Sequence, residues 1–224
     1  MEKYGTIPKR FTKEWWSYYW MYYKWHTIVG IVALLAVLIT AVQCAQTVDY
    51  DLYSLYIPPA AYDEARVAHI SEQLAQSIDD MTGDGRALVN GSVIALSSIT
   101  NVANDYDLAM VQKAYMELQV GDSYLFIING NLMQEYVANG TADYFEPVDA
   151  YLPDSFDRSK LNAMGMDVCR MVPLDGNKLF EEAGLPSKNM YLAVKSLYQV
   201  NEESPEHQAW YENAKKAAAR LLEQ

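Results

Sequence analysis

The 224-residue chain has few of the residues from which catalytic and metal sites are usually built. Its three histidines, His26, His69 and His207, show no metal-ligand spacing, and a glycine-rich phosphate loop is absent. Its two cysteines, Cys44 and Cys169, are too few for a disulfide framework, so a folded domain must rely on a hydrophobic core. We therefore expect no enzyme and no cofactor.

Positive charge is scarce after residue 45. The first 45 residues carry five basic and two acidic side chains, whereas residues 46–224 carry 12 basic and 27 acidic ones. A domain with this acidic excess repels nucleic acid and anionic lipid headgroups. We therefore expect no nucleic-acid partner.

One long apolar run stands out in the chain. Residues 27–45 are 19 residues without a formal charge, about 28 Å as a helix, which matches a bilayer core of about 30 Å. The run follows a basic and aromatic juxtamembrane segment, residues 1–26, whose rings are typical of headgroup depth. The sequence thus predicts a transmembrane helix over 27–45 with the lipid bilayer as a partner. The predicted interface residues are Trp15, Trp16, Tyr18, Tyr19, Trp20, Tyr22, Tyr23, Lys24 and Trp25.

The distribution of charge also predicts an orientation. All five basic residues of the amino-terminal part precede the apolar run, and the first basic residue after it is Arg66. The positive-inside bias therefore predicts a single-pass signal-anchor in the cell membrane, with a cytoplasmic N-terminus and an extracytoplasmic domain over 46–224. Two alternatives stay open: cleavage as a signal peptide, although Gln43 stands where a small residue is needed, and lipid modification of Cys44.

The remaining chain alternates between strand and helix patterns. Short β-rich or continuously apolar runs predict strands, and apolar residues at helical spacing predict helices, the last ending with basic residues. Pro147 and Pro153 lie in an irregular connection over 141–166. This alternation predicts a three-layer α/β domain with a mostly parallel sheet and a buried central strand over 124–128. Strands are expected at 50–57, 87–96, 124–128, 168–172 and 191–197, and helices at 62–78, from 105, at 129–139, at 178–184 and at 205–222.

Several loose motifs of the chain occur together in one group of proteins. They are the aromatic YYKWH box, the DLYSLYI strand, the GDG turn, GDSYLFI and NMYLAVKSL. In this combination the chain resembles uncharacterised single-pass membrane proteins of Gram-positive bacteria, whose exported domain is similar to one lobe of extracellular solute-binding proteins. The resemblance implies a single-pass topology and an exported domain with the fold of one such lobe. The 179 residues after the apolar run leave the second lobe of such a protein reduced or missing.

The turn at residues 80–86 is similar to the start of a calcium-binding EF-hand loop. Asp80, Thr82 and Asp84 would supply oxygen ligands at positions 1, 3 and 5. Position 12 falls on Gly91, so the bidentate glutamate is absent. The alternative interpretation is a turn in which Gly83 and Gly85 provide positive φ angles. We favour the turn and keep calcium as a possible ligand of these three residues.

Two functions remain after these exclusions. The first is a binding or interaction module for a small ligand or for another membrane or envelope protein, acting at the carboxyl ends of the parallel strands or through the aromatic segment. The second is a cell-surface hydrolase that uses Ser123. Gly121-Asp122-Ser123 is similar to the GDS block of a hydrolase family, but here it precedes a strand and lacks an evident base. The sequence favours the binding module.

Overall fold

The computed structural model describes residues 8–46, 48–60, 63–161, 168–197 and 202–223. The chain divides into two compact units, Met1–Val48 and Asp49–Gln224. The predictions on Cys44 and Tyr62 fall outside the described part of the chain, because the side chain of Cys44 and the whole of Tyr62 are not described.

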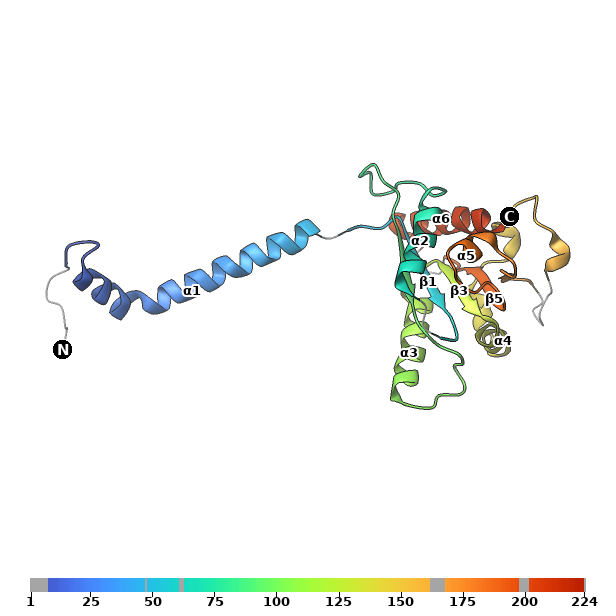
Figure 1. Cartoon of the computed structure of the whole chain (residues 1–224), viewed down its shortest axis with the longest axis horizontal. Coiled ribbons are helices and arrows are strands. Elements are labelled where there is room, and N and C mark those ends of the chain that lie inside the picture. The colour runs from blue at the N-terminus through green and yellow to red at the C-terminus, as the bar shows by residue number, and fades with distance from the viewer. Residues whose placement is uncertain (1–7, 47, 61–62, 162–167, 198–201, 224) are drawn as a thin grey trace. The chain divides into compact units, whose positions relative to one another are not determined.

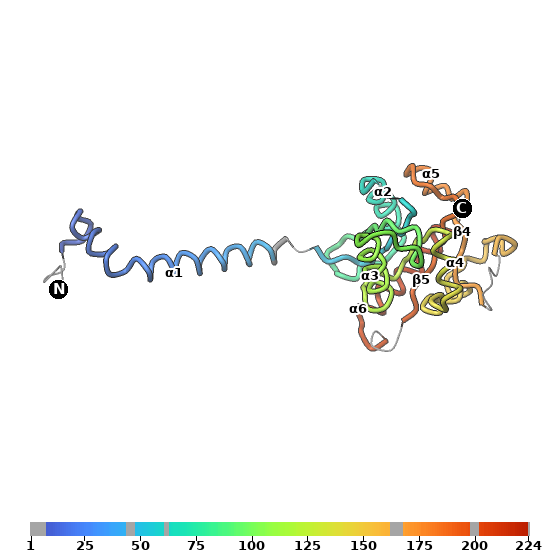
Figure 2. The backbone as a smooth tube through the Cα atoms, turned by 90° about the horizontal axis from the view of Figure 1, so that it is seen from below, coloured from blue at the N-terminus to red at the C-terminus, as the bar shows by residue number. Residues whose placement is uncertain are grey.

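The first unit is built around helix α1, Lys13–Gln46 (Figure 2). Thr12 begins it, because its hydroxyl accepts a hydrogen bond from the Trp15 amide at 3.2 Å. Among the described residues, α1 is the one helix that is long and apolar enough to cross a membrane. A helix of this kind confirms the apolar span predicted over 27–45 and extends it through the aromatic segment.

The aromatic segment forms a ladder along one side of α1. The rings of Trp15 and Tyr19 stack at 5.3 Å, and those of Tyr19 and Tyr23 stack at 5.6 Å. Residues four positions apart are neighbours on a helix surface, and each such pair adds about 0.2 to 0.5 kcal/mol. Trp20 and Trp25 remain exposed, at 58% and 68%. The predicted interface residues therefore lie on a single helix with large exposed rings.

The second unit is an α/β domain with a five-stranded sheet (Figure 1). The strand order is β2-β1-β3-β5-β4. Strand β1 pairs in parallel with β2 and β3, whereas β5 runs antiparallel to both β3 and β4. The strands are β1 Leu52–Ile57, β2 Val89–Val93, β3 Leu125–Asn129, β4 Val172–Pro173 and β5 Met190–Val194.

The sheet is mixed, so the prediction of a mostly parallel sheet is wrong in its second half. The error lies in the short helix α5, Lys178–Glu182, between β4 and β5. A parallel crossover needs a helix that runs back along the sheet, and five residues cover only about 7.5 Å. The strand predicted over 168–172 is also shorter than expected. The carbonyl of Cys169 instead accepts a hydrogen bond from the amide of Val148, in the irregular connection.

Helices cover both faces of the sheet. Packed against one face are α2, Glu64–Ala75, and α6, Pro205–Leu222, together with α5. The other face is covered by α3, Asp105–Gln119, and α4, Gly130–Ala138. Alternate residues of β3 enter the two cores, and all five of its residues are buried, which confirms the predicted central strand.

Polar side chains fix the first turns of the domain helices. At each start, an Asp, Asn or Ser side chain accepts a backbone amide hydrogen bond, which satisfies a donor that the helix leaves open. The capping residues of α2 to α6 are Asp63, Asn104, Asn129, Asn177 and Ser204. After α4, Gly140 has a φ of 71°, and the chain continues through three 3-10 turns, Thr141–Tyr144, Val148–Ala150 and Arg158–Lys160. This confirms the irregular connection up to residue 161.

Candidate binding pocket

A pocket of about 520 Å³ lies at the amino end of β1, in the size range of small-molecule sites. Its walls come from the start of β1, the turn before β2 and the first turns of α6. The lining includes the rings of Tyr50, Tyr53 and Trp210 and the exposed carboxylates Asp49 and Glu206. The pocket thus combines aromatic surface with negative charge.

The three rings of the pocket stand nearly perpendicular to their neighbours. Tyr50 and Tyr53 have ring centroids 5.7 Å apart at 69°, and Tyr53 and Trp210 have centroids 5.1 Å apart at 84°. The indole Nε1 of Trp210 donates to the carbonyl of Tyr50 at 3.0 Å. This bond joins residues 160 positions apart in the chain and fixes the indole plane against β1.

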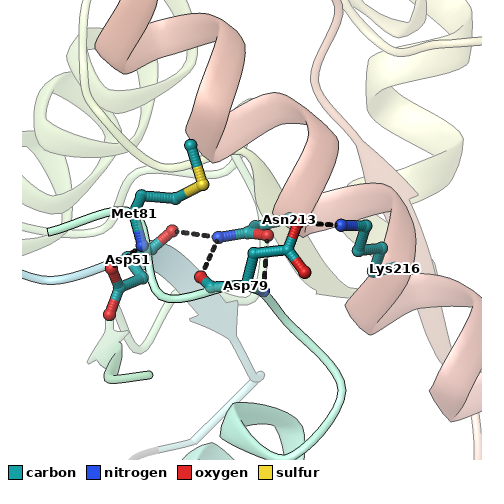
Figure 3. A network of polar contacts seen from close by, with 5 residues as sticks. All are labelled: Asp51, Asp79, Met81, Asn213 and Lys216. Carbon is teal, nitrogen blue, oxygen red and sulfur yellow. Dashed lines mark hydrogen bonds and ion pairs between the residues drawn. The ribbon is translucent and has the colours of Figure 1, made fainter. Parts of the chain in front are cut away.

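Asp51 anchors the turn that forms one wall of the pocket (Figure 3). Its side chain is fully buried, and Oδ1 accepts from the amides of Met81 and Thr82 at 2.6 and 2.9 Å. Oδ2 accepts from the amide of Leu88 at 2.7 Å. A carboxylate that receives several backbone amides forms strong charge-assisted bonds. The turn is therefore held to β1 from both of its ends.

Asn213 ties α6 to the same turn (Figure 3). Its Nδ2 donates to the carbonyls of Asp51 at 3.0 Å and Asp79 at 2.9 Å, while its Oδ1 accepts from the amide of Asp79 at 3.0 Å. Lys216, three residues further along α6, forms an ion pair with the Asp79 carboxylate. All three pocket walls are thereby linked through hydrogen bonds.

The predicted calcium ligands lie in this turn. Asp80 Oδ1 accepts from the Gly83 amide at 2.6 Å and from the Thr82 hydroxyl at 3.2 Å, and Oδ2 accepts from the Gly85 amide at 2.8 Å. The Gly83 amide is the main cause that holds the pKa of Asp80 below its usual value. Asp84 accepts from the Arg86 amide at 2.9 Å.

The two glycines have φ angles of 74° and 85°, which confirms the positive φ predicted for Gly83 and Gly85. Within the described part of the chain, no group of three or more His, Cys, Asp or Glu side chains is arranged to hold a metal ion. The turn interpretation accounts for the contacts of Asp80, Thr82 and Asp84. Calcium binding stays a prediction.

Ser123 lies in a second polar cluster, at the amino end of β3. Its hydroxyl donates to Glu117 Oε2 at 3.1 Å. Lys195 Nζ donates to the carbonyls of Glu117 and Gly121 at 3.2 and 2.5 Å, and burial lowers the pKa of Lys195 to about 8. Glu117 lies in the last turn of α3 and Gly121 directly after the C-cap residue Val120, so the buried lysine helps to cap that helix.

His207 contributes to the same cluster from α6. Its Nδ1 lies 2.9 Å from the hydroxyl of Tyr124, the residue that follows Ser123. Burial holds the pKa of His207 below its usual value. The sequence placed His207 near the last helix but carried no signal for this contact, because the two residues are 83 positions apart. His69 is exposed on α2.

The carboxyl ends of the parallel strands are arranged differently. Asn129 Nδ2 donates to the carbonyls of Ile57 and Leu96 at 3.1 and 2.8 Å and so joins the ends of neighbouring segments. Glu135, on α4, accepts from the hydroxyls of Ser98 and Thr100 and from the amide of Ile99. An open depression of about 550 Å³ lies here, between residues 97–101 and α4. Three of the polar side chains that line it, Ser98, Thr100 and Glu135, are bonded to one another.

Asp51 and Asn213 are the structural residues of the pocket that sequence reasoning missed. Asp51 directly precedes an apolar strand, and Asn213 directly precedes Ala214 in the apolar stripe of α6. A polar residue at the border of a buried segment is the only signal that could have marked them.

Protein-family models, curated proteins and solved structures were compared with this chain, and none of them matches it.

Proposed function

We propose that this protein is a membrane-anchored extracytoplasmic binding module whose α/β domain takes its ligand in the aromatic pocket. The observation that carries the proposal is the pocket's construction. Tyr50 and Tyr53 come from the start of β1, Trp210 comes from α6, and the buried bonds of Asp51 and Asn213 hold these elements together.

Such a site is rigid before a ligand arrives. Buried polar groups cost free energy unless they are hydrogen-bonded, and the Asp51 and Asn213 side chains are bonded at both of their polar atoms. A pocket whose walls are already fixed loses little conformational entropy on binding. This small entropy loss supports a binding function for the pocket.

The membrane location rests on α1 and on charge. The helix would anchor the domain in the bilayer, and the basic residues before the apolar run favour a cytoplasmic N-terminus. The predicted resemblance to one lobe of a solute-binding protein fits a receptor for a small solute. Another membrane or envelope protein is the alternative partner.

Cysteine labelling in intact cells tests the orientation. In a background without Cys44 and Cys169, we expect a membrane-impermeant thiol reagent to modify Lys188→Cys but not Lys9→Cys. Both positions are exposed, so burial does not explain a difference. Labelling of Lys9→Cys alone would contradict the proposed orientation.

Affinity purification tests the binding function. The full-length protein, solubilised in detergent, is purified beside the variant Trp210→Leu, and the co-purifying molecules are identified. We expect a molecule that the wild type retains and the variant loses, while both proteins keep the same circular dichroism spectrum. If both folded proteins retain the same molecules, the pocket is not the site.

A hydrolase is the second candidate because His207 and Lys195 gather around the segment that contains Ser123. If Ser123→Ala abolishes an ester hydrolysis that the purified wild type performs, while the variant remains folded, the binding-module proposal gives way to the hydrolase. We expect no such activity, because Ser123 is buried, with an exposed fraction of 4%, and a substrate cannot reach its hydroxyl.

A further inference from the structure

We propose that the aromatic pocket recognises an organic ammonium group, such as the trimethylammonium of choline-like compounds. The inference rests on the proposed binding function and specifies the chemistry of its ligand. Three features of the pocket carry it: the sign of its charge, the arrangement of its rings and the engagement of the nearby amines.

The charge at the pocket is negative. Asp49 and Glu206 are exposed at its lining, and none of the described residues that line it is a lysine, arginine or histidine. The domain as a whole adds to this potential, because residues 46–224 carry 27 acidic and 12 basic side chains. A low-dielectric cleft lined by one sign of charge concentrates ligands of the opposite sign. An anionic ligand would meet repulsion from both carboxylates.

The rings offer more than one surface to a cation. The face of an aromatic ring carries partial negative charge and attracts cations within about 6 Å of its centroid. Because Tyr53 stands nearly perpendicular to both Tyr50 and Trp210, the ring planes of the lining differ in direction. The three rings contact one another edge to face and all line the pocket, so an ammonium group in the pocket would meet aromatic surface, as in the aromatic cages that bind quaternary ammonium groups.

Two lysines that pack around α6 and β3 have other partners. Lys216, on α6, pairs with Asp79, which precedes the turn, and Lys195 is buried against the Tyr124 ring and the carbonyls of Glu117 and Gly121. Neither of these lysines forms a described ion pair with Asp49 or Glu206. Among the described residues, none of the ion pairs involves Asp49 or Glu206, so both carboxylates can meet an external cation.

Isothermal titration of the full-length protein in maltoside micelles tests the proposal. The probes are choline, glycerophosphocholine and 3,3-dimethylbutan-1-ol, a neutral molecule with nearly the shape of choline. We expect choline or glycerophosphocholine to bind at least about tenfold more tightly than the neutral alcohol. Tighter binding of choline would indicate a free solute, and tighter binding of glycerophosphocholine would indicate a lipid headgroup.

Two sets of variants locate the binding. Asp49→Asn combined with Glu206→Gln should raise the dissociation constant about three- to tenfold and weaken its salt dependence, without affecting folding, because both side chains are exposed. Glu182→Gln, an exposed carboxylate on α5, is the matched control and should change nothing. Tyr53→Leu should weaken binding further, with circular dichroism as the check of folding.

Equal binding of the neutral alcohol, or an affinity unaffected by the double variant, would overturn the ammonium inference. No binding of either ammonium probe would also overturn it. The proposed function fails separately, because it depends on whether Trp210→Leu loses a molecule that co-purifies with the wild type, whatever the charge of that molecule.

Discussion

The two ends of the parallel strands use their polar residues in opposite ways. At the amino end, Asp51 and Asn213 are buried beneath an open aromatic pocket and fix its walls. At the carboxyl end, Asn129 and Glu135 bond neighbouring loops to each other. Ligands of open α/β sheets commonly bind at the carboxyl end. In this domain the aromatic surface lies at the other end.

The mixed sheet explains part of this difference. Because β5 runs antiparallel to β3, the chain that enters β5 reaches the carboxyl end of β3. There the carbonyl of Asn189 accepts the Gly130 amide at 2.9 Å, and the Asn189 side chain would meet a Cβ at Gly130 at 2.0 Å. If β5 were parallel to β3, the last residues of β5, and not its first, would lie at this end of the sheet. The carboxyl end of β3 is therefore covered by the antiparallel neighbour.

The largest effect is expected from the buried carboxylate at the amino end. Asp51→Ala removes the acceptor of three backbone amides. An unsatisfied buried donor costs about 1 to 3 kcal/mol, and Met81 and Thr82 are exposed, so the free energy of unfolding should fall by about 3 kcal/mol, the low end for three donors. Urea unfolding of the full chain in micelles measures the loss. Asp51→Asn, which keeps one acceptor oxygen, should lose less.

A smaller effect is expected from the matching residue at the carboxyl end. Glu135→Ala removes an acceptor of two hydroxyls and one amide, but this side chain is only half-buried and water can replace it in part. We expect a loss of about 1 to 2 kcal/mol in the same urea experiment. If Glu135→Ala costs as much as Asp51→Ala, the two ends do not differ in the way described.

Lys195 gives the amino end a distinctive pH dependence. Its pKa falls from 10.5 in the unfolded chain to about 8 in the folded one, chiefly through burial. At pH values between about 8 and 10.5, Lys195 is protonated in the unfolded state but not in the folded one. The free energy of unfolding therefore rises with pH over this range. At about 1.4 kcal/mol for each pKa unit, the rise is on the order of 3 kcal/mol.

A comparison of wild type with Lys195→Met separates the pH dependence that Lys195 gives to the free energy of unfolding from that given by the tyrosines and Cys169. We expect the difference between their free energies of unfolding to change between pH 8 and pH 10 and to be constant from pH 6 to pH 7.5. A constant difference across the whole range would show that Lys195 is not desolvated.

The smallest effect is expected from calcium. Since backbone amides and a hydroxyl already occupy the Asp80 carboxylate, millimolar calcium should leave the melting temperature of the full chain unchanged. A ligand at 100 times its dissociation constant adds about 2.7 kcal/mol, which would be visible as a shift of several degrees. A rise that Asp84→Ala abolishes would establish the calcium site.

Much of the fold was predictable because its signals are local. The apolar run of α1, the buried strand β3 and helix α6 each follow from the order of residues along one short segment. The antiparallel β5 was not predictable in this way. Its direction depends on how far a five-residue helix can carry the chain, and the alternation of strands and helices does not record that distance.

The candidate pocket was less accessible to sequence reasoning. Its rings belong to segments 160 residues apart, and its supporting residues, Asp51 and Asn213, are 162 apart. Neither pair forms a sequence motif, because nothing in the residues next to each member indicates its distant partner. The turn at 80–86 has a recognisable local sequence pattern, whereas the contacts of Asp79, directly before it, with α6 form only in the tertiary fold.

Hydrogen-deuterium exchange of the full-length protein, with its co-purified ligand bound and after its removal, tests most directly which end of the sheet binds. The account predicts that the ligand slows exchange in residues 49–53, 81–88 and 205–210, with little change in residues 97–101 and 131–138. Protection confined to residues 97–101 and 131–138 would place the ligand at the carboxyl end and would contradict the assignment of the aromatic pocket.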